Sequence, residues 1–202
     1  MRKIFCAVLA LLMLISLAAC KNTEQQPELS QPTAVGEWTT QVDMAETVNS
    51  MVYAQTGAST VSVSFPVTLM LTISADGTYK LLPDRQLLDE QIDAIGTVLW
   101  QLVVDQAAAQ SHMSSADTVE ALRNQGKSRE LLIQQLDLAS VFVNSFTQNG
   151  VWLADDTSIC FAPDADSLAD AVAYSITLTS DQFTIAYSEE EQTKTVAFIK
   201  AK

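Results

Sequence analysis

Side chains that commonly carry enzyme chemistry are scarce in this sequence of 202 residues. It contains one histidine, His112, and three cysteines, of which Cys6 and Cys20 lie near the N-terminus. A tetrahedral zinc site would need several carboxylates beside these groups, and no Gly-x-Ser-x-Gly motif is present to hold a nucleophilic serine. A Ser-His-Asp triad that used His112 would have to be assembled from a loop. We therefore expect no enzyme activity, no bound metal and no cofactor.

Basic residues are also few. The chain has 11 Lys and Arg against 24 Asp and Glu, which gives a formal net charge of −13. A protein this acidic repels the phosphates of nucleic acids and the headgroups of anionic lipids. We exclude nucleic acid as a partner and interpret the acidity as a property that keeps the protein soluble.

Glycine is rare as well, and one apparent calcium-binding motif lacks the glycine that such a loop requires. Asp164-Ala165-Asp166 resembles the start of a calcium-binding loop, but Leu168 occupies the next ligand position and Ala169 replaces the required glycine. Helix capping by Asp166 or Ser167 explains these residues more simply. A loose surface calcium site that uses Asp164, Asp166 and Asp170 is the alternative.

The N-terminus carries the most specific pattern in the sequence. Arg2 and Lys3 precede an apolar run over residues 4–17, and Ala18 and Ala19 precede Cys20. The run is shorter than the roughly 20 apolar residues that span a bilayer, and the polar residues Lys21, Asn22 and Thr23 follow Cys20 directly. Leu17-Ala18-Ala19-Cys20 resembles the lipobox of bacterial lipoprotein precursors. This resemblance implies cleavage between Ala19 and Cys20 and a lipid-anchored protein on the extracytoplasmic face of the cell membrane.

Lipidation would take place at Cys20. The resemblance implies that its thiol carries a diacylglycerol with chains such as palmitate, and two acyl chains hold a protein stably where one holds it marginally. Removing two of the 11 basic residues with the leader leaves nine against 24 acidic residues, a net charge of −15. Cys160 is then left without an intramolecular disulfide partner. It lies between Ile159 and Phe161, so we expect an inert thiol in a buried strand.

The sequence divides into three parts. We expect a signal peptide over residues 1–19, then the lipidated cysteine and a disordered tether over residues 20–35, which is polar and contains Pro27 and Pro32. A single domain follows over residues 36–202.

The domain begins with strand patterns. A short run over residues 38–44 precedes a short helix over residues 45–55, and residues 60–65 and 67–74 alternate between apolar and polar side chains. Asp76-Gly77 predicts a hairpin turn, because the favoured turn needs positive φ angles. Residues 78–82 form the returning strand, which Pro83 ends.

Helical periodicity replaces strand alternation at about residues 84–148. A face of Leu88, Ile92, Ile95, Leu99, Leu102 and Val103 predicts a helix over residues 84–110. A second helix is expected to begin near Asp117, with Glu120 completing a capping box, and to stop near Gly126. Ser128 caps a third helix, whose apolar positions are Leu132, Leu136, Ala139, Val143 and Phe146. Asn149-Gly150 is expected to end that helix.

Strands return in residues 151–154, 158–161, 171–179, 182–188 and 193–200, with turns at Asp155-Asp156, at Ser180-Asp181 and around residues 189–191. The predicted fold class is α+β: an antiparallel, barrel-like sheet with a helical insertion between its early and late strands.

Gly36-Glu37-Trp38 near the first strand, Ala75 to Tyr79 at the hairpin and the final strands through residues 196–200 resemble the lipocalin-like lipoproteins of Gram-positive gut bacteria. The similarity covers residues 36–202, and it implies the fold more than an activity. Gly36, Trp38, Asp76 and Gly77 carry the structural motif. The resemblance implies that Trp38 closes one end of the barrel. The chain departs from the family in lacking the arginine that lipocalins stack under this tryptophan.

Three functions follow as hypotheses. The first is a binding module for a small apolar or amphipathic ligand inside the barrel. The second is an envelope interaction or assembly factor that uses the helical insertion as its partner surface, because about 65 residues exceed what a connection needs. The third, ranked last, is a hydrolase that uses paired carboxylates.

Overall fold

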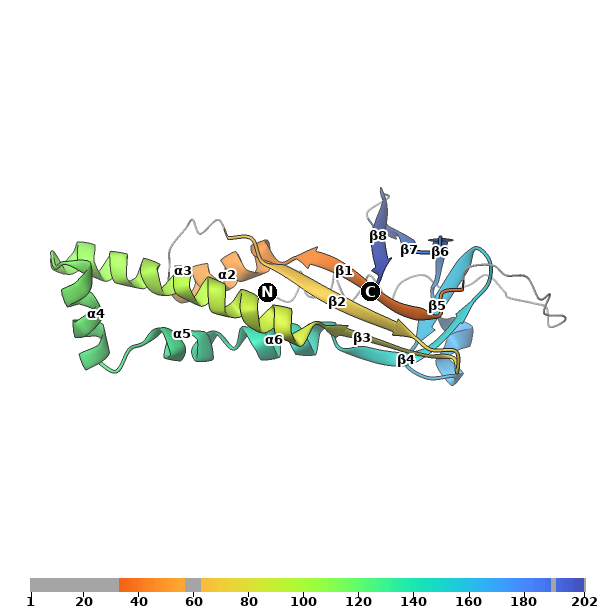
Figure 1. Ribbon diagram of the computed structural model, residues 1–202, viewed down its shortest axis with the longest axis horizontal. Coiled ribbons are helices and arrows are strands. Elements are labelled where there is room, and N and C mark those ends of the chain that lie inside the picture. The colour runs from red at the N-terminus through yellow and green to blue at the C-terminus, as the bar shows by residue number, and fades with distance from the viewer. Residues whose placement is uncertain (1–32, 57–62, 190–191, 202) are drawn as a thin grey trace. The chain divides into compact units, whose positions relative to one another are not determined.

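The computed structural model describes residues 33–56, 63–189 and 192–201 (Figure 1), which form two compact units. The described part of the first unit comprises residues 33–40, 70–82 and 147–201 without the gap at 190–191. The second comprises residues 41–69, without 57–62, and 83–146. The expected cleavage and lipidation residues, Ala19 and Cys20, lie outside the described part of the chain.

Eight strands form a closed antiparallel barrel in which every strand neighbours the next one in the sequence and β8 pairs with β1. The strands are β1 (Gly36–Asp43), β2 (Pro66–Ile73), β3 (Thr78–Pro83), β4 (Gln148–Ala154), β5 (Ser158–Ala162), β6 (Ala173–Leu178), β7 (Gln182–Glu189) and β8 (Gln192–Lys200). The predicted α+β barrel is confirmed. Residues 63–65, in the second expected strand segment, are not in a strand, and the rest of that segment is not described.

The hairpin between β2 and β3 turns at Asp76 and Gly77, as the sequence predicts, but Asp76 does not take the positive φ angle that the expected turn type needs. Gly77 has a φ of 84°, and its N–H donates to the carbonyl of Ser74 over 3.1 Å. The Asp76 carboxylate accepts from both the N–H and the hydroxyl of Thr78, at 3.0 and 2.6 Å. These hydrogen bonds lower the pKa of Asp76.

Helices fill the second unit. They are α2 (Ala45–Thr56), α3 (Arg85–Ser111), α4 (Ser115–Asn124), α5 (Arg129–Leu136) and α6 (Leu138–Phe146), and the last four lie between β3 and β4 in the sequence. The helical insertion between early and late strands is therefore confirmed. The core of the second unit includes Phe65, which stacks on Phe142 with ring centroids 5.0 Å apart. A 3-10 turn, η1 (Asp166–Asp170), belongs to the first unit. None of the helices in the described part is long and apolar enough to span a membrane.

The apolar face predicted for α3 is correct only over its first half. Leu88, Ile92, Ile95 and Leu99 are buried, but Val104 is buried in place of Leu102 and Val103. The first half lies beside α5, where the Arg129 guanidinium bonds the Asp93 carboxylate, and the end of α3 meets α4 (Figure 1). The side of α3 that is buried therefore changes along the helix, at the point where its packing neighbour changes from α5 to α4.

Three helix boundaries differ from the sequence prediction. The cap of α4 is Ser114, whose hydroxyl accepts from the Asp117 N–H over 3.2 Å, so this helix begins two residues before Asp117 and Glu120 closes no capping box. The expected third helix is broken at Asp137, where a φ of 44° ends α5. Asn149 and Gly150 lie within β4 and pair with Lys80 and Tyr79, so they do not end a helix.

The predicted buried positions of the third helix change with that break. Leu136 and Phe146 are buried, while Leu138 and Phe142 replace Ala139 and Val143. The left-handed residue at Asp137 restarts the helix in a new register, so α6 turns a different side toward the core. Ser128 caps α5 as expected, and its hydroxyl accepts from the Leu131 N–H.

Candidate ligand-binding sites

Alternation along the strands gives the barrel an apolar inner wall. Successive side chains of a strand point to opposite faces, and cross-strand partners point to the same face. The buried residues of this inner cluster are Ala34, Trp38, Leu71, Ile73, Ile159, Tyr174, Phe183 and Phe198. Eleven further apolar residues pack against it and are only partly buried: Tyr79, Leu81, Trp152, Ala154, Phe161, Val172, Ile176, Leu178, Ile185, Tyr187 and Val196.

Trp38 lies in the tightly packed part of the inner cluster. Its side chain is 1% exposed, and its indole N–H donates to the carbonyl of Ala34 over 2.8 Å. Its ring centroid lies 5.7 Å from that of Phe183. The Lys200 ammonium lies 5.8 Å from the centroid of the indole ring, within the range of a cation–π contact. A lysine on β8 thus stacks on Trp38, which sequence reasoning missed because it searched for an arginine.

The partly buried part of the inner cluster includes one continuous row across three strands. Ile176 on β6 pairs with Ile185 on β7, and Ile185 pairs with Val196 on β8. All three are partly buried, whereas Phe183 and Phe198 in the neighbouring row are buried. The inner wall is therefore closed by packing at the Phe183 row and partly accessible at the Ile185 row.

Two tyrosine hydroxyls lie among these apolar side chains. Burial raises the pKa of Tyr79, and burial raises the pKa of Tyr174 to about 12, with smaller contributions from Cys160 and Tyr79. The Tyr79 ring also meets the edge of Phe161, with centroids 4.8 Å apart. Cys160 is partly buried, less than the sequence predicted, because its neighbours Ile159 and Phe161 take the inward positions of β5.

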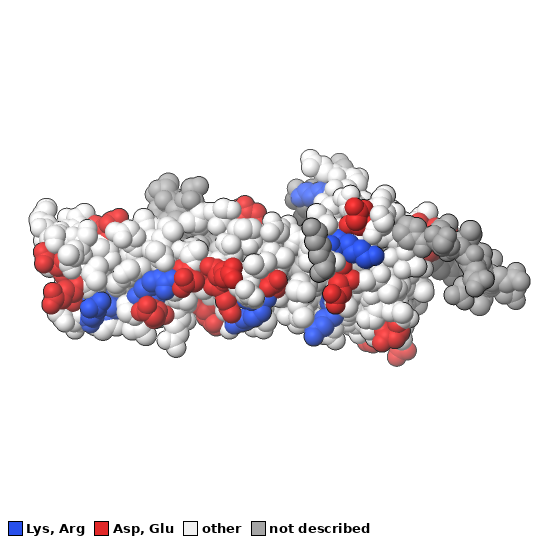
Figure 2. Space-filling view, in the orientation of Figure 1, with Lys and Arg blue, Asp and Glu red and all other residues white. Residues whose placement is uncertain are grey.

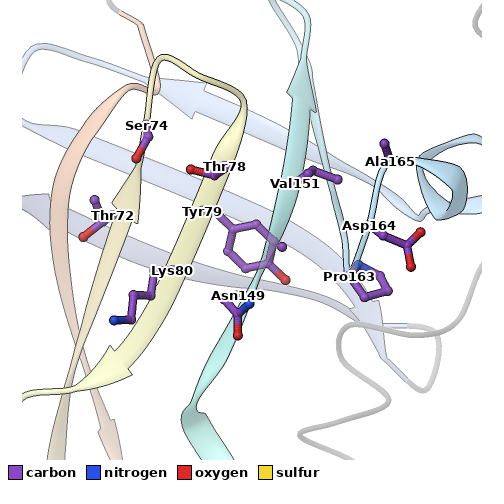
Figure 3. A pocket seen from close by; sticks show the side chains of 11 residues that line it. Thr72, Ser74, Thr78, Tyr79, Lys80, Asn149, Val151, Pro163, Asp164 and Ala165 are labelled. Carbon is purple, nitrogen blue, oxygen red and sulfur yellow. The ribbon is translucent and has the colours of Figure 1, made fainter.

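The outer wall of the barrel carries an open groove of about 610 Å³ that is lined by both polar and apolar groups. Figure 3 shows its residues on β2, β3 and β4 and on the segment that follows β5. They are Thr72, Ser74, Thr78, Tyr79, Lys80, Asn149, Gly150, Val151, Pro163, Asp164 and Ala165. The pairs Thr78–Val151 and Lys80–Asn149 are cross-strand neighbours. Sequence reasoning missed this groove, because β3 and β4 are separated by the whole helical insertion.

Gly150 permits the close approach that shapes one side of the groove. A β-carbon at this position would collide with the carbonyl oxygen of Ala162 and would lie 3.0 Å from the α-carbon of Pro163. Both obstacles are backbone atoms, so a larger residue would displace the end of β5. The segment that brings Asp164 to the groove thus depends on a glycine in β4.

The remaining residues that the sequence singled out are dispersed. Gly36 begins β1, and Trp152 packs in the inner cluster and donates its indole N–H to the Ser74 carbonyl over 2.9 Å. The cap position of η1 is Ala165, so neither Asp166 nor Ser167 caps it as expected, and the Asp164 carboxylate accepts from the N–H and hydroxyl of Ser167. Within the described residues, no group of three or more His, Cys, Asp or Glu could hold a metal ion.

Asp155 forms the turn between β4 and β5, as expected. Its carboxylate accepts from the N–H groups of Thr157 and Ser158 over 2.8 and 2.7 Å, and these hydrogen bonds lower its pKa.

Comparison with known proteins gives no relative from which a function could be carried over. No family model, no curated protein and no solved structure matches this chain.

Proposed function

We propose that this chain is a membrane-anchored extracytoplasmic lipoprotein that binds a small apolar or amphipathic ligand in its barrel and does not transform it. The observation that carries the proposal is the partly accessible apolar row of Ile176, Ile185 and Val196 inside a closed barrel. Eight-stranded barrels have an interior that side chains fill or that holds one small ligand, as in lipocalins.

The strand order supports the likeness to lipocalins that the sequence suggested. An up-and-down barrel of eight strands is the lipocalin architecture. Lys200 stacks on Trp38, as the arginine of that family stacks on its tryptophan. In this proposal the Trp38 end is sealed, and the ligand lies against the Ile185 row.

The test measures binding to delipidated full-length protein by native mass spectrometry and by titration with a fluorescent fatty acid. Ile185→Trp should fill the accessible row and weaken binding by at least about tenfold. The matched control is Thr184→Trp, because Thr184 is the neighbouring residue and points to the outer face. Circular dichroism establishes that both variants fold.

Two results would contradict the proposal. One is the absence of both a bound adduct and saturable binding in the unmodified protein, which would mean that side chains fill the barrel. The other is an equal loss of binding in Ile185→Trp and Thr184→Trp. Competition by an unlabelled fatty acid separates specific binding from adsorption of the dye.

A second candidate function is protein interaction through the helical insertion. Leu87, Val98 and Leu102 on α3 are 40%, 44% and 36% exposed. Their spacing of 11 and four residues places them along one side of the helix. A photocrosslinking residue at Val98 should then give one defined protein adduct in intact cells, and the same residue at Gln101 should not. Identical patterns from both positions would exclude this function.

A further inference from the structure

The outer groove takes no part in the function proposed for the barrel interior. Its polar side chains Thr72, Ser74, Thr78, Lys80 and Asn149 alternate with the inward residues of β2, β3 and β4, so they belong to the opposite face of the wall. Of the residues that the structure describes, only Tyr79 both packs against the inner cluster and lines the groove. The groove is therefore a separate candidate site.

The groove presents many hydrogen-bonding groups and little net charge. Three hydroxyls, from Thr72, Ser74 and Thr78, each offer a donor and two acceptor lone pairs, and the Asn149 amide offers both kinds of group. The Thr78 hydroxyl already donates to Asp76, which leaves its lone pairs to accept. Such a mixture of donors and acceptors complements ligand hydroxyls, which are themselves both donors and acceptors.

The charges of the groove balance. Among the described residues that line it, Lys80 is the one cation and Asp164 is the one anion. Within the described residues, the Lys80 ammonium has no ion-pair partner, while one Asp164 oxygen is occupied by Ser167. An anionic ligand would meet a single lysine, the nearby Asp164 and a chain with a net charge of −13. These charges favour a neutral ligand.

The shape also limits the ligand. A peptide strand could not be added to β2, β3 or β4, because each of them has a neighbour on both sides in the closed barrel. A volume of about 610 Å³ falls within the range of small-molecule sites. Tyr79, Val151 and Pro163 supply apolar surface beside the polar groups, as a sugar ring with one C–H face requires (Figure 3).

We propose that this groove binds a neutral saccharide of one or two rings. Asn149 and Lys80 lie side by side across β3 and β4 and hydrogen-bond the hydroxyls of the sugar. Thr72 on the adjacent strand β2 and Ser74, which directly follows that strand, bind further hydroxyls of the sugar. The apolar face of the ring lies against Val151 and Pro163.

The experiment is saturation-transfer difference NMR followed by calorimetric titration on the full-length protein in detergent. The probes are glucose, galactose, N-acetylglucosamine and their β-1,4-linked disaccharides, each at about 10 mM, because small ligands with few contacts bind in the millimolar range. At least one neutral sugar should bind. Asn149→Ala and Lys80→Ala should each weaken that binding by about tenfold, the effect of losing roughly one hydrogen bond between the protein and the sugar.

The matched control is the double variant Thr177→Ala and Thr184→Ala. These two residues form a cross-strand pair on the outer wall of β6 and β7, away from the groove, and their loss should leave sugar binding unchanged. Fluorescent fatty-acid binding is measured on every variant, and Asn149→Ala and Lys80→Ala should not alter it. These measurements therefore distinguish a groove that binds no sugar from a barrel that binds no fatty acid.

Three outcomes would overturn the saccharide site. One is the absence of binding for every neutral sugar in the panel. Another is sugar binding that Asn149→Ala and Lys80→Ala leave intact in folded protein. The last is Lys80-dependent binding of glucuronate or inorganic phosphate in preference to the neutral sugars, which would identify an anion site.

Discussion

Tyr174 places a phenol inside the apolar inner cluster of the barrel, where its side chain is 5% exposed. Burial, followed by the nearby Cys160 and Tyr79, raises its pKa to about 12 from an ordinary value of 10. The folded protein therefore keeps a proton between pH 10 and 12 that the unfolded chain releases. Stability must fall as the pH rises through this range, because the folded state then binds more protons than the unfolded state.

We predict that the free energy of unfolding of the unmodified protein falls between pH 10 and 12 and that Tyr174→Phe reduces this fall. Denaturant titrations at several pH values measure it. Tyr53→Phe is the control, because Tyr53 is 58% exposed and lies outside the inner cluster. An unchanged pH dependence in Tyr174→Phe would show that Tyr174 ionises as readily in the folded chain as in the unfolded one.

Gly150 lies so close to the backbone at the end of β5 that replacing it should change the stability of the protein. We predict that Gly150→Ala destabilises the protein by about 1–3 kcal/mol, the cost of overpacking, because the new methyl group collides with backbone atoms of residues 162 and 163. Asn149→Ala, which changes the adjacent exposed residue, should cost less than about 0.5 kcal/mol. Thermal and denaturant unfolding compare the two variants. Equal stability would mean that the end of β5 moves aside without strain.

At the scale of elements, the start of α4 shows how a cap decides a helix boundary. The Ser114 hydroxyl accepts from the Asp117 N–H over 3.2 Å and donates to the Asp117 carboxylate over 2.6 Å. We predict that Ser114→Ala lowers the free energy of unfolding by about 1 kcal/mol, the usual value of an N-cap. Glu120→Gln should have little effect, since Glu120 closes no capping box. If Glu120→Gln lowered the free energy of unfolding more than Ser114→Ala does, the helix start that the sequence predicts near Asp117 would be correct instead.

Strand alternation is the part of the fold that the sequence predicts best. Val67, Leu69, Leu71 and Ile73, the apolar members of the alternating segment over residues 67–74, are all buried, because a period of two indicates a strand with one buried face. The break at Asp137 could not be predicted in this way. Aspartate occurs within helices as well as in left-handed conformations, and only the packing of α5 and α6 selects the second.

Contacts between segments that are distant in the chain could not be predicted from the sequence either. Asn149-Gly150 reads locally as a helix end, yet pairing with Tyr79 and Lys80 makes it part of β4. Nothing in either segment specifies its partner, which lies about 70 residues away in the sequence. The groove depends on the same long-range pairing, so its residues could be recognised individually but not as one site.

At the scale of the whole molecule, the excess of acidic residues leaves basic residues among the acidic ones on the face that Figure 2 draws. The described residues include the ion pairs Arg85–Asp89 and Arg129–Asp93. An acidic chain lacks electrostatic attraction to anionic lipids, so the membrane attachment proposed here must come from the lipid on Cys20.

Replacing Cys20 tests this attachment. Each buried methylene contributes about 0.8 kcal/mol, so two acyl chains should retain the protein in the membrane and their loss should release it. We predict that the unmodified protein enters the detergent phase on phase partitioning, while Cys20→Ala enters the aqueous phase and lacks the mass of the lipid. Cys160→Ala is the matched control, because it removes the other thiol that remains after cleavage and should leave partitioning unchanged. Cys20→Ala protein that stayed in the detergent phase would mean that another part of the chain holds it to the membrane.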